Sequence, residues 1–444
     1  MSWAIPMVAA VTAVLLAASP GAASQQRPID RSRAAPTVDV SASDLRLTLG
    51  RLLGEHAYLA MEAMRAAATN RADADALLGG LDKNSTELTA AVASVYGADA
   101  GSEFERLWQQ HIDALVAFAR ARAAGNQAAM DGARASMDNF RAAFSRFLAD
   151  ANPNLSGDAE AHALQLHLDQ LTSFVEVDYR QAFATARAAY SHMFEFGDDL
   201  ARAIAAQFPE RFDGGNVAFS GRTTLRRDLG RLLGEHLVLA AEAMRAGLDG
   251  RPDAAAAASS LRANSADLAS LIGNVYGSDA EAAFAELWGR HIETYLGYIG
   301  AVRSRNAAGR TAALRDLQVY HTAVAEFVHA AAPALSVRDV EALISHHVTA
   351  LINQVDASAA GDHVRSVSVT REAYAHMFEV GDALGTAIAD QFPERFPDLK
   401  DFPATSAIGA AEADHPGPPV GLSFLIGFVT FVILAVRGRP GRPT

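Results

Sequence analysis

Eight of the chain's histidines form two sets of four that recur at matching places in the sequence. Each lies among apolar residues at helical spacing; His56, for example, has Leu52 and Leu59 on the same stripe. A buried imidazole without a hydrogen-bond partner costs about 1–3 kcal/mol, so several at one level need a shared partner. The sets predicted to converge are His56, His111, His167 and His192, and His236, His291, His347 and His376.

Three interpretations of this histidine layer stay open. A metal ion satisfies several imidazoles at once, and histidines with few carboxylates favour zinc or copper, with iron also compatible. A purely structural hydrogen-bonded layer with Asn84 and Asn264 is the second interpretation, and a pocket for an organic ligand or haem is the third. Asn84, Asn264, Glu195 and Glu379 are predicted to lie in a second shell around the layer.

Enzymatic activity is not indicated by any motif of this chain. It contains no G-x-S-x-G, no P-loop, no Rossmann glycine pattern and no H-E-x-x-H. The Glu-x-x-His pattern of di-iron bundles is absent, because Glu195 follows His192. A catalytic metal site would need an open coordination position and a base, and no base is evident, so no catalytic residue is predicted.

Composition excludes several kinds of site and partner. The chain of 444 residues has no cysteine, which removes disulfides, thiolate metal sites and cysteine nucleophiles. Its net charge of −13 argues against a nucleic-acid partner. Half of the residues are hydrophobic, so the chain can form a packed core.

The body of the chain is a duplication. LGRLLGEH occurs at 49–56 and again at 229–236, an offset of 180. A four-residue insertion shifts the later offset to 184, which aligns QFPERF at 207–212 with 391–396. Two modules are therefore predicted, module 1 at 40–213 and module 2 at 222–398, each forming its own domain.

The elements that must position the histidines are helices. Apolar residues recur with helical period throughout a module, and breakers such as Gly97 and Pro153 separate the segments. The fold class predicted is all-α, with two tandem antiparallel bundles of about six helices each and one C-terminal transmembrane helix. The helices predicted in module 1 span 44–68, 73–95, 99–124, 126–149, 157–175 and 177–207.

The two ends of the chain predict export and anchoring. Residues 1–24 read as a signal peptide, or alternatively as an uncleaved anchor. A Pro-rich tether at 399–419 precedes an apolar run at 420–436, the predicted transmembrane helix, and an Arg tail at 437–444 is predicted to be cytoplasmic. A buried core helix is the alternative for the apolar run. The expected location is the cell membrane, single-pass, with the body outside the cytoplasm.

The pattern LL-x-EH…N…YG…LW-x-x-HI…NP…H…Y-x-H-M…QFP resembles a group of uncharacterised exported bacterial helical proteins that often carry one such module. It covers most of residues 44–212 and 224–396. The resemblance implies a helical exported protein and no particular activity, cofactor or binding residue. The function expected from the residues is binding of a ligand, most simply a metal ion, for sequestration, delivery or sensing. An interaction or spacer module with a structural layer is the alternative, and no protein partner is indicated.

Overall fold

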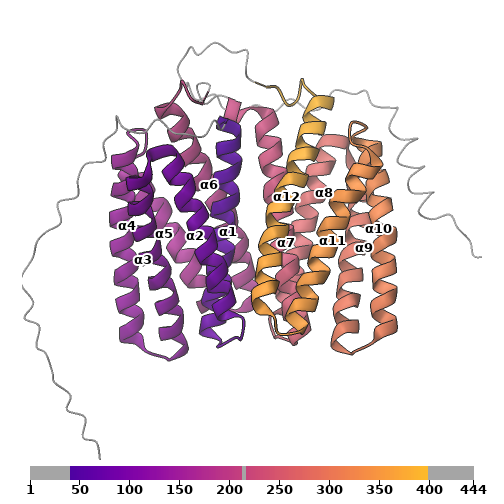
Figure 1. The fold of residues 1–444 in the computed structure, drawn as a ribbon, viewed down its shortest axis with the longest axis horizontal. Helices are drawn as coiled ribbons and strands as arrows, with labels where there is room; N and C mark the ends of the chain where they lie inside the picture. Colours follow the sequence, from indigo (N-terminus) through magenta and orange to yellow (C-terminus); the bar gives the residue numbers. More distant parts are fainter. Residues whose placement is uncertain (1–40, 213–216, 399–444) are drawn as a thin grey trace, which may run out of the picture.

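The computed structural model describes residues 41–212 and 217–398, and this part of the chain is helical, without a β-strand (Figure 1). The prediction of an all-α fold is confirmed, and the six helix ranges predicted for module 1 agree with the structure to within two residues at each end. Module 1 contains α1 (Ala42–Ala68), α2 (Ala74–Tyr96), α3 (Ala98–Ala123), α4 (Gln127–Ala151), α5 (Gly157–Glu176) and α6 (Tyr179–Gln207). Module 2 contains α7 (Gly221–Asp249), α8 (Ala254–Tyr276), α9 (Ser278–Arg303), α10 (Ala307–Ala331), α11 (Val337–Ala359) and α12 (His363–Gln391), and a 3-10 helix, η2 (Val217–Phe219), precedes it.

The predicted signal peptide at 1–24, tether at 399–419, transmembrane helix at 420–436 and Arg tail at 437–444 lie outside the described residues. Within the described ranges, no helix combines the length and the apolar character needed to cross a membrane.

Local sequence fixes the helix ends in the same way in both modules. Side chains of Ser41 in module 1 and Ser220 in module 2 cap α1 and α7 by accepting a backbone N–H of the first turn. The sharp corners between α2 and α3 and between α8 and α9 fall on Gly97 and Gly277, with φ of 89° and 92°. Only glycine adopts this backbone conformation without strain. The helix register that places the histidines therefore follows from capping and turn residues.

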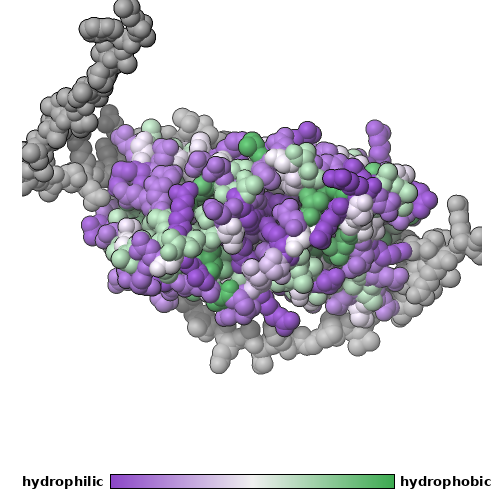
Figure 2. All heavy atoms as spheres, turned by 90° about the horizontal axis from the view of Figure 1, so that it is seen from below, coloured by the Kyte–Doolittle hydropathy of each residue, from purple (hydrophilic) through white to green (hydrophobic). Residues whose placement is uncertain are grey.

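Helices α1 and α7 lie in the middle of the molecule, where the two modules meet (Figure 1). Helix α1 contacts α2, α3, α5 and α6 of its own module and also α7 and α12 of the other. The main cluster of buried apolar residues runs through both modules. Seen from below the bundle, the surface is mainly hydrophilic with small apolar patches (Figure 2). The division into two separate domains stays a prediction, because the main core does not stop at the module boundary.

Residues at the contact between the modules meet their own repeat counterparts. The hydroxyls of Tyr190 and Tyr374 lie 2.9 Å apart, and the rings of Phe194 and Phe378 stack with centroids 6.1 Å apart. This is the pattern of a two-fold axis, at which the same patch of two copies is self-complementary. The contact is thus the covalently linked equivalent of a symmetric dimer interface.

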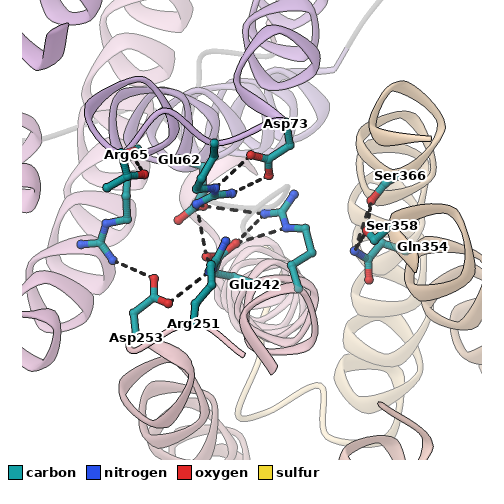
Figure 3. A network of polar contacts seen from close by, with 12 residues as sticks. Glu62, Arg65, Asp73, Glu242, Arg251, Asp253, Gln354, Ser358 and Ser366 are labelled. Carbon is teal, nitrogen blue, oxygen red and sulfur yellow. Dashed lines mark hydrogen bonds and ion pairs between the residues drawn. The ribbon is translucent and has the colours of Figure 1, made fainter. Parts of the chain in front are cut away.

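A buried cluster of acidic and basic side chains crosses this contact (Figure 3). Glu62 of α1 and Glu242 of α7 are 1% and 0% exposed and share Arg71 and Arg245 as partners. Arg251 adds a further ion pair with Glu242. The cluster is asymmetric, because Arg245 lies 2.7 Å from Glu242 but 3.8 Å from Glu62.

This asymmetry separates the two glutamates electrostatically. Burial, together with the negative charge of Glu242, raises the pKa of Glu62 to about 7. Burial also acts to raise the pKa of Glu242, but Arg245 and Arg251 outweigh it and hold that pKa below its ordinary value. Glu62 therefore takes up a proton as pH falls through about 7, while Glu242 stays ionised.

The substitution Glu62→Gln should stabilise the chain at pH 8 relative to the parent, by on the order of 1–3 kcal/mol. The pKa of Glu62 is raised on folding, so its contribution to stability is full at low pH and is lost as pH rises through 7. Chemical denaturation at pH 6 and 8 measures the effect. The matched variant Glu242→Gln should destabilise the chain at both pH values, since it removes the closest carboxylate of Arg245 and one of the two ion pairs of Arg251. Equal behaviour of the two variants would contradict this assignment.

Candidate metal centre

Three helices of module 1 bring three of its four predicted histidines together. His56 of α1, His111 of α3 and His167 of α5 are 0%, 0% and 2% exposed. Their nitrogen atoms can be chosen so that all lie within 4.8 Å of one another, and the Nε2 atoms of His56 and His111 are 3.2 Å apart. The rings of His56 and His167 have centroids 5.7 Å apart. We refer to this group as histidine cluster 1.

Module 2 repeats the arrangement as histidine cluster 2, formed by His236 of α7, His291 of α9 and His347 of α11. All three are buried, and their nitrogen atoms again lie within 4.8 Å of one another. The Nε2 atoms of His236 and His291 are 3.4 Å apart. His291 Nδ1 donates to the Trp288 carbonyl, so a neutral His291 directs the lone pair of Nε2 at His236.

The fourth histidine of each predicted set lies apart from its cluster. Nε2 of His192 is 3.0 Å from the Ala163 carbonyl oxygen, and Nε2 of His376 is 3.1 Å from the Leu343 carbonyl oxygen. Both rings thus donate Nε2–H to a neighbouring backbone. Nδ1 of His376 also lies 3.0 Å from the exposed carboxylate of Glu379. Glu195, which is the counterpart of Glu379 in module 1, is exposed as well.

Neither Asn84 nor Asn264 donates a hydrogen bond to an imidazole of its cluster. Asn84 Nδ2 donates to the Leu52 carbonyl and to Glu55 Oε2, at 3.0 Å and 2.9 Å. Glu55 precedes His56, is 2% exposed, and accepts two hydrogen bonds from Arg371 of α12, both at 3.0 Å. Glu55, which adjoins cluster 1 through His56, is therefore held by an arginine of the other module.

The same three-residue contact recurs around cluster 2. Asn264 donates to Glu235 Oε2 at 2.8 Å, and Arg187 of α6 donates to Glu235 Oε1 at 2.9 Å. Glu235 precedes His236 and is 2% exposed. Each module therefore supplies the arginine that neutralises the buried acid beside the other module's cluster.

Aromatic rings enclose both clusters. In cluster 1, His111 stacks on Phe140 with centroids 4.5 Å apart, and Trp108 lies 4.6 Å from His56. In cluster 2, His291 stacks on Tyr320 at 4.7 Å, and Trp288 lies 4.8 Å from His236. These ring contacts favour an occupant of atomic size over a haem or another organic ligand.

Burial keeps the clustered imidazoles neutral. It lowers the pKa of His111, His291 and His347 to about 3, and it lowers the pKa of His56, His167 and His236 well below the ordinary value. Neighbouring histidines lower the pKa of His56, His167, His236 and His347 further. Neutral imidazole is the form that ligates a metal, so the clusters need not lose protons at neutral pH before binding.

Several of the clustered nitrogens have no hydrogen-bond partner. They are Nδ1 of His56 and both nitrogens of His167 in cluster 1, and Nδ1 of His236 and both nitrogens of His347 in cluster 2. Each buried polar atom left in this state costs about 1–3 kcal/mol. A complete structural hydrogen-bond layer would satisfy these atoms, and the protein side chains around them do not.

The geometry is compatible with coordination. Metal–nitrogen bonds of about 2.0–2.1 Å place two ligand nitrogens about 3.3–3.6 Å apart in tetrahedral or trigonal sites. The Nε2 separations of 3.2 Å and 3.4 Å are close to this range. The third nitrogen lies within 4.8 Å of the other two, so it would have to move by on the order of 1 Å to bind the same ion. What the arrangement offers chemically is a dry, neutral set of three nitrogen donors.

The cross-module arginines were not predicted as part of the site. Arg187 and Arg371 are equivalent at the offset of 184, and Glu55 and Glu235 at the offset of 180. Retention of both pairs in both copies is the signal that could have revealed them. A helix pattern alone does not show that the partner of Glu55 comes from the other module.

Comparison of this chain with protein-family models, with curated proteins and with solved structures gives no match.

The metal-free chain should lose stability as pH falls from about 6.5 towards 4.5. The six clustered histidines have a lower pKa folded than unfolded, so the unfolded chain takes up more protons in this range. Each can contribute up to about 1.4 kcal/mol per pH unit. Six such groups should outweigh the opposite trend of Glu62 and Glu160, each with pKa raised to about 7. Denaturant titrations measure the slope, and a slope unchanged in His111→Gln/His291→Gln would contradict the assignment.

Replacing Arg371 by Gln should cost about 3 kcal/mol of stability, because it leaves the buried Glu55 carboxylate without its cation. The equivalent change Arg187→Gln should cost a similar amount through Glu235. Thermal and denaturant unfolding measure both. Arg134→Gln, which breaks the exposed ion pair with Glu176, is the control and should change stability by less than about 1 kcal/mol. Effects of Arg371→Gln no larger than this control would be inconsistent with the proposed role.

Proposed function

We propose that each module binds one metal ion through its histidine cluster, and that the protein holds these ions outside the cytoplasm while anchored to the membrane. The observation that carries the proposal is the set of three buried imidazoles with nitrogens within 4.8 Å of one another. Both nitrogens of His167 and of His347 lack a hydrogen-bond partner, which leaves a donor of each cluster free for an added ion. Export and anchoring rest on the sequence of the two ends.

Among sequestration, delivery and sensing, the burial of the clusters favours sequestration. No clustered imidazole is more than 2% exposed, so an ion enters or leaves only when the helices separate locally. Slow exchange suits retention of an ion better than rapid transfer or sensing. Catalysis is the least favoured role, because a catalytic metal needs a position open to substrate.

One observation favours a structural alternative. The Nε2 atoms of His56 and His111 at 3.2 Å are also at hydrogen-bond distance, so one ring can donate to the other. In that alternative the cluster fixes helix register, and the modules serve interaction or spacing.

Metal analysis of the full chain, purified without a His tag, tests the proposal. The parent should contain about two equivalents of one metal per chain, and His111→Ala/His291→Ala should contain less than about a tenth of that. His192→Ala/His376→Ala is the matched control and should retain the metal, because these rings bond to backbone carbonyls. A parent without metal after incubation with zinc, copper and iron would favour the structural alternative.

A further inference from the structure

We infer that the histidine clusters select a monovalent ion, Cu(I), over divalent ions such as Zn(II). This inference rests on the proposed metal binding and adds the identity of the ion. It follows from three features: the charge of the donor set, the pairing of the adjoining carboxylates with arginines, and the number of ligands that each cluster supplies.

The donor set brings no negative charge to the ion. Both candidate groups within the described residues consist of histidine alone, and an imidazole ligand carries no negative charge. A bound ion therefore keeps its whole charge in a dry interior. The cost of moving an ion from water to a medium of low dielectric constant grows with the square of its charge, so it is about fourfold larger for a divalent ion of equal radius.

The buried acids that adjoin ligand histidines in the sequence do not offset this cost. Glu55 and Glu235 directly precede ligand histidines, but each already pairs with an arginine from the other module. Asn84 and Asn264 donate to the same carboxylates. Their negative charge is balanced by these contacts before any ion binds.

The number of ligands points the same way. Zn(II) in proteins is almost always four-coordinate, and its fourth ligand is a side chain or a water. Around cluster 1 the neighbouring rings of Trp108 and Phe140 lie in contact with the imidazoles, and neither offers a good ligand atom. In cluster 2 Trp288 takes the place of Trp108, and Tyr320, which takes the place of Phe140, contacts His291 by stacking of the two rings. Cu(I) accepts three nitrogen donors, and copper is among the metals that imidazole suits. Sodium and potassium are disfavoured because they prefer oxygen ligands.

Competition titrations on the full chain under anaerobic, reducing conditions test the inference. Cu(I) is titrated against a chromogenic Cu(I) chelator, and Zn(II) against a zinc chelator in a parallel series. We expect two Cu(I) per chain, bound at least roughly 1000-fold more tightly than Zn(II). The variant His111→Ala/His291→Ala should lose both Cu(I), and His192→Ala/His376→Ala should keep them.

The outcomes separate this inference from metal binding itself. Two Zn(II) per chain bound as tightly as Cu(I), and lost in His111→Ala/His291→Ala, would overturn Cu(I) selection and leave metal binding intact. Failure of the parent to bind either ion would overturn both Cu(I) selection and metal binding by the clusters. Cu(I) binding that survives in His111→Ala/His291→Ala would also overturn both. In a further variant, His167→Asp/His347→Asp supplies a carboxylate to each cluster. Cu(I) preference should then fall by at least roughly tenfold, with helical content checked by circular dichroism.

Discussion

Three buried imidazoles can meet in one place only if the helices that carry them are held in a defined arrangement. Each ring comes from a different helix, so α1, α3 and α5 must keep one axial register for the nitrogens to meet. The capped helix starts and the glycine corner at Gly97 set that register locally. Stacking of His111 on Phe140 then holds the orientation of this ring. The arrangement keeps the donors neutral and leaves several of their nitrogens in need of a partner.

The contact between the modules extends this constraint across the whole molecule. Glu55 and Glu235 are buried because α1 and α7, which carry them, lie at the contact between the two modules. A buried carboxylate needs a cation. The cation comes from the opposite half in both cases, as Arg371 for Glu55 and Arg187 for Glu235. Neither half can release its arginine without leaving a buried charge in the other. The two clusters therefore belong to one packed unit, joined at a two-fold contact of counterpart residues.

Much of this could be predicted from the sequence. Helical periodicity and the breakers between segments gave the helix bounds, and the position of His56, His111 and His167 along their helices predicted that they meet. The position of His192 could not be predicted in this way. This residue lies on an apolar stripe, as the three clustered histidines do. Its axial position relative to α5, however, depends on packing along the whole of α6, and in the structure its ring meets the Ala163 carbonyl. Arg371 could likewise not be predicted as the partner of Glu55, because helical periodicity shows which face of a helix is buried and not which residues pack against that face.

An anomalous-scattering crystal structure of the full chain, collected at the absorption edge of the metal that copurifies, shows directly whether an ion occupies each histidine cluster. We expect two anomalous peaks per chain, one inside each histidine cluster, about 2.0–2.1 Å from three imidazole nitrogens. His192 and His376 should remain on their backbone carbonyls. Clusters without a peak, with the imidazoles bonded to one another or to ordered water, would contradict metal binding by the clusters.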